Sequence, residues 1–194
     1  MKKIIAVIII LILAIGGCIY LFLKYRGSNN DKQESVKLNL NNMIKISSPV
    51  FLNNLDNRLR SIPQKYTCDG ENINPEFLIE GVAEQTKSLV LIMDDPDAPL
   101  RTFTHWLVWN ISPKTKEIKE NSVPEGAVLG MNDFRKVDYG GPCPPTGVHR
   151  YFFRIYALDT ILNIPQGSER KTLEEAMENH IIDKGELVAR YSRQ

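Results

Sequence analysis

Residues 88–99 read SLVLIMDDPDAP, and this stretch decides the fold. Its first half, Ser88 to Met93, is a short apolar run typical of a strand buried on both faces. Its second half places three carboxylates within four residues and restricts the backbone with Pro96 and Pro99. Neighbouring carboxylates repel one another unless an opposite charge or a hydrogen bond compensates. The stretch therefore predicts a core strand followed either by a solvated acidic turn or by a loop that presents carboxylates rigidly, and both interpretations stay open.

Other segments extend the β pattern in both directions along the chain. His105 to Ile111 and Tyr151 to Leu158 are rich in the aromatic and β-branched residues that strands favour. Residues 50–52 and 187–191 are weaker strand candidates. We therefore expect a mainly antiparallel β core with a few helices, joined by loops rich in glycine and proline.

One helix is predicted near the C-terminus. Thr172 and Glu175 have the spacing of a capping box, in which the two side chains satisfy backbone N–H groups at a helix start. Leu173 and Met177 then fall on one face of the helix. We expect this helix to begin after Thr172 and to pack its apolar face on the β core.

Two histidines stand beside the predicted strands. Strand alternation places His105 on the same face as Trp109, and His149 on the same face as Tyr151. The loop before the second histidine, residues 139–148, is rich in glycine and proline. Backbone N–H groups in such loops bind anions such as phosphate. Each feature taken alone is also compatible with a purely structural role.

These side chains share a function only if they meet in space. A protonated histidine and backbone amides would hold a phosphate, whereas nearby carboxylates repel a bare dianion. We therefore expect a zwitterionic or esterified phosphate, which also brings hydrogen-bond donors, rather than inorganic phosphate.

The composition excludes several classes of protein. The 194 residues include 24 Lys and Arg and 23 Asp and Glu, a net charge of +1 that lacks the basic excess of a nucleic-acid-binding protein. The sequence has no His-Glu-x-x-His motif, no cysteine pair at zinc spacing, no Gly-x-Ser-x-Gly elbow and no Walker loop. We therefore expect no nucleic acid, no metal and no cofactor.

The N-terminus carries a hydrophobic segment. Residues 4–23 contain no charged side chain, and a helix of this length rises about 30 Å, the thickness of the hydrocarbon core of a bilayer. Three interpretations stay open: an uncleaved transmembrane signal-anchor, which we favour, a lipoprotein signal lipidated on Cys18, and a cleaved secretory signal. Lys2 and Lys3 before the segment favour an N-terminus inside the cell and a domain outside the cytoplasm.

The sequence divides into three parts. Residues 1–26 form the anchor or signal segment, residues 27–45 a flexible polar tether, and residues 46–194 a folded domain large enough for one core. Cys68 and Cys143 are the two cysteines of the domain, and outside the cytoplasm they would form a disulfide. Two free buried thiols are the alternative.

The motifs of the domain together resemble the phosphatidylethanolamine-binding protein family, and within it the bacterial and archaeal Raf kinase inhibitor-like (YbhB/YbcL-type) branch. The resemblance spans about residues 46–191 and keeps the motifs in order. The motifs that carry it are Ile62-Pro63, Tyr66-Thr67-Cys68-Asp69-Gly70, Asp94-Asp95-Pro96-Asp97-Ala98-Pro99, Thr104-His105-Trp106, Asn132-Asp133-Phe134 and the run from Gly140 to Tyr151.

The resemblance implies a β-sandwich with flanking helices and a small anion pocket near one surface. Arg135 departs from the family pattern, which usually has a glycine at this position. The kinase-regulating role of animal relatives is not carried over. The implied pocket residues are Asp95, Asp97, His105, His149 and Tyr151, with Gly141 and Pro142 at the rim.

Three functions compete. The first is a membrane-tethered domain that binds a small phosphorylated or anionic ligand in a His/Asp/Tyr pocket. The second is a protein-interaction domain, similar to relatives that inhibit proteases or kinases, with an unknown protein partner. The third is acid–base hydrolysis of a phosphoester. Because the sequence shows no activated nucleophile, we favour binding over catalysis.

Overall fold

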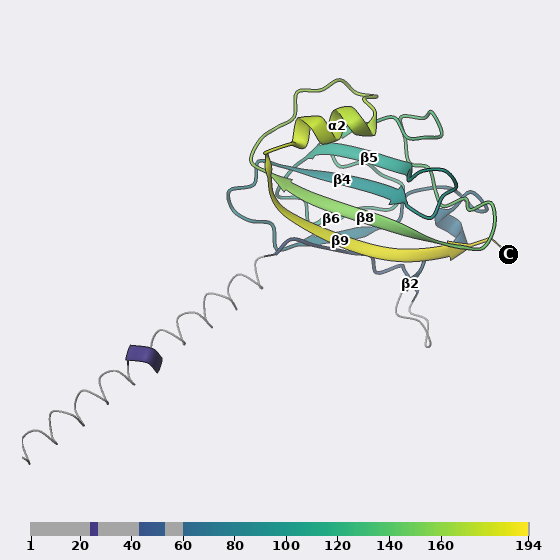
Figure 1. Ribbon diagram of the computed structural model, residues 1–194, viewed down its shortest axis with the longest axis horizontal. Coiled ribbons are helices and arrows are strands. Elements are labelled where there is room, and N and C mark those ends of the chain that lie inside the picture. Colours follow the sequence, from purple (N-terminus) through teal and green to yellow (C-terminus); the bar gives the residue numbers. More distant parts are fainter. Residues whose placement is uncertain (1–23, 27–42, 53–59, 194) are drawn as a thin grey trace, which may run out of the picture. The chain divides into compact units, whose positions relative to one another are not determined.

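A computed structural model gives the fold of the chain (Figure 1). It describes residues 24–26, 43–52 and 60–193. The chain divides into two units, residues 1–42 and 43–194, and every strand discussed below lies in the second unit.

One large sheet dominates the domain. Within the described residues it has six strands in the order β2-β9-β8-β4-β5-β7, of which β2 pairs parallel with β9 and the others pair antiparallel. All eight residues of β4 are buried, because this strand lies in the middle of the sheet and both of its faces are covered. The strands are β2 (Arg60–Ser61), β4 (Ser88–Asp95), β5 (Phe103–Ile111), β7 (Val128–Leu129), β8 (Val148–Leu158) and β9 (Ile181–Ser192).

A small sheet and a helix cover the two faces of the large sheet. Apolar residues of the small sheet pack on one face, together with Phe153 and Ile155 of β8. Helix α2 packs Leu173 and Met177 on the other face, and Figure 1 shows it above β5 and β4. The small sheet has the order β1-β3-β6, with β1 (Lys45–Ser47), β3 (Phe77–Glu80) and β6 (Glu117–Ile118); α2 is Arg170–Met177, and a short 3₁₀ helix, η1, is Gln64–Tyr66.

This layered architecture confirms the expectation of a mainly β domain with few helices. Strand bounds differ from the predictions in one respect that matters for function. Strand β4 continues through Asp94 and Asp95, so these two carboxylates belong to the strand and not to the loop after it. The pairing of Asp94 with Phe152 of β8 and of Asp95 with Phe103 of β5 extends the strand beyond its apolar run.

The predicted start of the helix was wrong. Helix α2 begins at Arg170, with Glu169 at the N-cap position and no side-chain capping bond, so Thr172 lies inside the helix. The Glu169 carbonyl accepts the N–H of Leu173, and the Arg170 side chain donates to Glu174 one turn later. These contacts favour a helix that begins two residues before the predicted cap.

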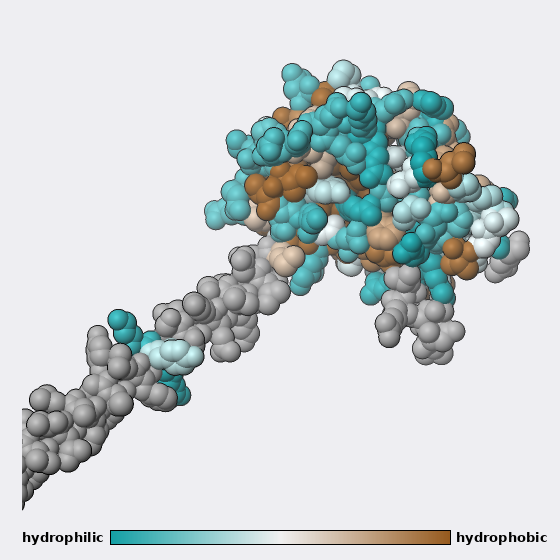
Figure 2. Space-filling model, in the orientation of Figure 1, coloured by the Kyte–Doolittle hydropathy of each residue, from teal (hydrophilic) through white to brown (hydrophobic). Residues whose placement is uncertain are grey.

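The predicted N-terminal features fall largely outside the described part of the chain. Residues 4–23, Cys18 and most of the predicted tether are not described. Among the residues that are described, no helix is both long enough and apolar enough to cross a membrane. On the face of the domain seen in Figure 2, exposed apolar side chains form small patches separated by polar ones.

Candidate functional site

The two carboxylates at the end of β4 point to opposite faces of the sheet, as successive strand residues do. Asp94 meets Arg154 and Arg170 on the face covered by α2. Asp95 lies on the other face, is only 3% exposed, and its Oδ2 accepts a hydrogen bond of 2.7 Å from Nδ1 of His149. This bond fixes the orientation of the imidazole and leaves its Nε2 to meet a ligand.

Strand β8 supplies the next two side chains of the site, because His149 and Tyr151 alternate onto the Asp95 face. Tyr151 is fully buried, and its hydroxyl has no hydrogen-bond partner among the described residues. Burial is the main reason why the pKa of Tyr151 lies well above its ordinary value, and the charge of Asp95 raises that pKa further. The phenol therefore stays protonated beside the Asp95 carboxylate and the Cys143 backbone, neither of which meets the geometry of a hydrogen bond to its hydroxyl.

A β-bulge directs His105 into the same site. Met93 of β4 pairs with Trp106, and Asp94 pairs with Thr104, so His105 is an extra residue in β5. The sequence placed His105 on the face of Trp109, which packs under α2, and that prediction was wrong. The bulge instead puts the His105 ring 5.3 Å from the ring of Tyr151, edge to face.

His105 is held in a defined protonation state. Its Nδ1–H donates to the carbonyl of Gly140 at 2.7 Å, and the side chain is almost fully buried. Desolvation lowers the pKa of His105 below its ordinary value, so the ring is neutral near pH 7. With Nδ1 protonated, Nε2 carries a lone pair that accepts a hydrogen bond.

The glycine- and proline-rich loop packs beside the site, but its first amides are engaged within the protein. The Gly140 N–H donates to the carbonyl of His105, and the Gly141 N–H donates to Oδ1 of Asn72 at 2.8 Å. Pro142 has no N–H. In this conformation the N–H groups of Gly140 and Gly141 are used within the protein, and anion binding by the rest of the loop stays a prediction. A side chain at position 141 would also collide with Asn72 and with the Tyr66 carbonyl, which explains the glycine.

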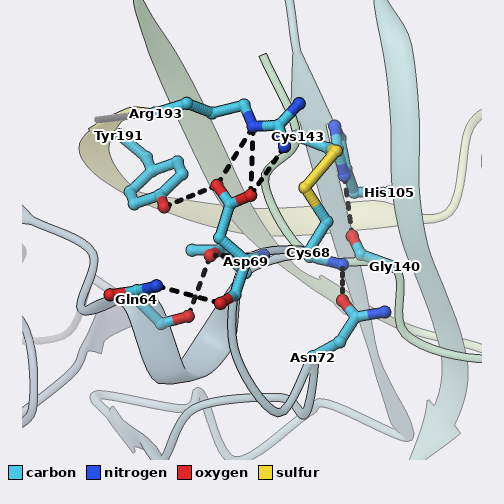
Figure 3. Close-up of a disulfide and its surroundings, with 11 residues drawn as sticks. Gln64, Cys68, Asp69, Asn72, His105, Gly140, Cys143, Tyr191 and Arg193 are labelled. Carbon is cyan, nitrogen blue, oxygen red and sulfur yellow. Dashed lines mark hydrogen bonds and ion pairs between the residues drawn. A yellow bond between two sulfur atoms is a disulfide. The ribbon is translucent and has the colours of Figure 1, made fainter. Parts of the chain in front are cut away.

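A disulfide joins this loop to the segment that follows η1. The sulfurs of Cys68 and Cys143 are bonded, and the Cys68 N–H donates to the Pro142 carbonyl. In the view of Figure 3 the disulfide lies between the His105–Gly140 hydrogen bond and Asp69. The loop that packs against His105 is therefore anchored covalently.

Asp97 lies next to the site, and its backbone N–H and its carboxylate have different partners. Its backbone N–H donates to Oδ1 of Asp95 at 2.8 Å, whereas its carboxylate receives two side-chain hydrogen bonds and one backbone bond from Arg150. The Arg150 guanidinium lowers the pKa of Asp97 to about 2. The carboxylate is thus occupied outside the pocket, and a direct ligand contact by Asp97 stays a prediction.

The structure therefore brings four of the seven predicted ligand residues, Asp95, His105, His149 and Tyr151, into one buried cluster, and the buried Gly141 and Pro142 belong to the loop beside it. Sequence reasoning missed Asn72 and Arg150, which position the loop and Asp97. Asn72 follows a Gly-containing turn and has a left-handed φ of 59°, a conformation that Asn tolerates. In the described part of the chain no cluster of His, Cys, Asp or Glu side chains could hold a metal ion.

Comparison with known proteins gives one family. The profile described as "Phosphatidylethanolamine-binding protein" matches residues 54–192. A UPF0098 protein of Pyrococcus horikoshii is 46% identical to this chain, over all of this chain and 91% of the relative.

Solved structures of two similar proteins share the fold. A "putative phosphatidylethanolamine-binding protein (PEBP) homolog" from Chlamydia trachomatis aligns with a TM-score of 0.73 and 38% identity, over 79% of this chain and 99% of the other. YbcL of E. coli, described as a member of the mammalian PEBP family, aligns with a TM-score of 0.70 and 27% identity, over 78% and 99% of the two chains.

Proposed function

The chain belongs to the phosphatidylethanolamine-binding protein family, and from this premise we propose that its domain binds a small phosphate ester in the cluster of Asp95, His105, His149 and Tyr151. The fully buried hydroxyl of Tyr151 carries the proposal. A buried hydroxyl without a partner loses its hydrogen bond to water and gains none in return. A ligand oxygen that accepts from Tyr151 would remove this penalty.

The charges of the cluster favour an ester that also carries donors. The Asp95 carboxylate already accepts from His149 and from the Asp97 N–H, and neutral His105 offers a lone pair at Nε2. Both groups attract an ammonium or hydroxyl group and disfavour a bare phosphate dianion. Phosphoethanolamine combines a phosphate that accepts from Tyr151 with an ammonium group that donates to these acceptors, and it is the ligand class we expect.

The proposal includes the location of the domain. Residues 4–23 have the length and apolarity of a membrane anchor, which would hold the domain at a membrane on its extracytoplasmic side. Lipid-derived phosphate esters would then be available to the domain at high local concentration.

The test compares two tyrosines of one strand. Tyr151→Phe removes the unpartnered hydroxyl, and Tyr156→Phe removes a hydroxyl from the opposite face of β8. Isothermal titration of the full chain with phosphoethanolamine should show an affinity about tenfold lower for Tyr151→Phe, the effect of losing one hydrogen bond to a charged ligand. Tyr156→Phe should bind like the unchanged protein. Equal affinity of the two variants, or no binding by the unchanged protein, would overturn the proposal.

A further inference from the structure

Among the arginines of the described domain, Arg190 is the one whose guanidinium has no hydrogen-bond or ion-pair partner. Arg60 donates to the carbonyl of Ser48. Arg190 is partly buried, yet its guanidinium has neither a carboxylate nor a carbonyl partner among the described residues. The arginines that contact a carboxylate are Arg101, Arg135, Arg150, Arg154, Arg170 and Arg193.

The lack of a partner for the Arg190 guanidinium is unusual, because Arg190 lies next to another arginine in the sheet. Arg190 of β9 lies directly opposite Arg150 of β8 in an antiparallel pair. Like charges at such positions destabilise a sheet. Asp97 compensates Arg150, whose two side-chain hydrogen bonds to that carboxylate are 2.7 and 2.8 Å long. Arg190 keeps its charge without compensation, and no contact within the described fold accounts for it.

A groove of about 860 Å³ lies at this end of the sheet. Its volume falls in the range of small-molecule sites, roughly 300–1,000 Å³. Polar and apolar side chains both line it, and Leu52 and Val148 are more than half exposed there. The lining also includes Arg190, Arg193, Asp69, Tyr191 and Ser192.

The charge of the groove is positive. Among the described lining residues, Asp69 is the one carboxylate. It accepts a hydrogen bond of 2.8 Å from the Tyr191 hydroxyl and forms an ion pair with Arg193 (Figure 3). These bonds lower the pKa of Asp69 and use its charge within the protein. Arg190 is the cation that remains for a ligand.

We propose that this groove is a second binding site, which takes an amphiphilic carboxylate. The guanidinium of Arg190 would hold the carboxylate as a planar fork, and the alkyl part would contact Leu52 and Val148. The groove is separate from the cluster around Tyr151, because none of the four side chains of that cluster, Asp95, His105, His149 and Tyr151, lines it. It therefore does not depend on the phosphate ester proposed above.

The experiment uses octanoate and acetate as probes of the full chain, followed by NMR of the Arg190 side-chain N–H and the Val148 methyl groups. We expect saturable shifts at both residues with octanoate, and an affinity for acetate at least tenfold lower because acetate lacks the apolar chain. Arg190→Gln should weaken octanoate binding at least tenfold.

Two matched variants make the result decisive. Arg60→Gln removes a neighbouring cation that already has a partner, and it should change octanoate affinity less than twofold. Tyr151→Phe should leave octanoate binding unchanged, so that failure of the buried site and failure of the groove are distinguished. Because Arg190→Gln removes a like-charge pair, we expect it to fold with an unchanged or higher melting temperature. Octanoate binding that survives Arg190→Gln, or absence of shifts at Val148, would overturn the proposal.

Discussion

Asp94 and Asp95 are neighbours in sequence, end the same strand and are both almost completely buried, yet their surroundings are opposite. Asp94 faces two guanidinium groups, those of Arg154 and Arg170, which in turn reach Glu186 and Glu174. Asp95 faces the imidazole of His149 and a single backbone N–H. One carboxylate is surrounded by guanidinium cations, and the other by an imidazole and a backbone N–H.

From this difference we expect the Asp94 face of the sheet to stabilise the fold and the Asp95 face to bind the proposed ligand. Ion pairs on the Asp94 face tie α2 to β4 and β8. The Asp95 face keeps an unpartnered phenol at Tyr151 and two imidazoles with Nε2 available. A strand that ends in two acidic residues can therefore place one carboxylate among ion pairs and the next beside an unpartnered phenol.

The largest expected effect comes from breaking the Asp94 face. Asp94→Ala leaves two arginines without their shared, buried partner, and breaking a buried pair costs about 3–5 kcal/mol in free energy of unfolding. Urea denaturation of the full chain measures this loss. At a temperature where the variant is folded, its affinity for phosphoethanolamine should stay within twofold of the unchanged protein.

The matched change on the other face is Asp95→Ala, which should give the reverse pattern. It removes two hydrogen bonds, so we expect a smaller loss of about 1–3 kcal/mol together with loss of ligand binding. If Asp94→Ala and Asp95→Ala show the same ratio of lost stability to lost affinity, the two faces of the sheet do not have separate roles.

The next effect in size concerns the disulfide, which lies beside the binding cluster. Replacing both cysteines, Cys68→Ser with Cys143→Ser, should lower the free energy of unfolding by about 2–4 kcal/mol, as expected for a loop of this length. Unlike Asp94→Ala, it should also weaken phosphoethanolamine binding, because it releases the loop that carries Gly140 and Gly141. Calorimetry and titration measure the two effects, and reducing the unchanged protein with dithiothreitol should reproduce them. Unchanged affinity in the folded double variant would show that the hydrogen bonds of Asn72 and His105 suffice to position the loop.

Much of the fold could be predicted because its signals are local. The apolar run of β4 and the aromatic run of β8 were both predicted as strands and are strands in the structure. The resemblance of the motifs to a known family supplied the residues of the cluster. The two cysteines are bonded, which their number in the domain left open. The two strands depend on residues that are close in sequence, and the disulfide joins the two cysteines of the domain.

The errors share a physical cause, which is pairing between distant segments. The bulge at His105 depends on the register of β5 against β4, and no property of residues 103–111 alone specifies it. The carboxylate of Asp97 is engaged by Arg150, which lies 53 residues away. Asn72 reaches Gly141 across 69 residues. Sequence reasoning named residues that the structure brings together, but it could not tell which of their atoms already have partners within the fold.

The smallest effect concerns Asp97, the third carboxylate of the acidic stretch, which is neither in the core nor bound to a histidine. The folded-state pKa is about 2, below the ordinary value of 3.8, chiefly because of the hydrogen bonds from Arg150. A carboxyl with a depressed pKa stabilises the folded state above its ordinary pKa, and this contribution disappears as pH falls through the folded-state value. The contribution should therefore be complete above about pH 4 and largely lost near pH 2.

Asp97→Asn provides the measurement, because it removes the titration and keeps the shape of the side chain. At pH 6 the unchanged protein should be more stable than the variant by less than about 1 kcal/mol, since Arg150 is half exposed and solvent screens the pair. Between pH 4 and pH 2 the gap should close, as seen by urea denaturation of both proteins at each pH. A gap that stays constant over this range would mean that Asp97 acts only through the N–H that it donates to Asp95, and its carboxylate would then be free to serve the ligand.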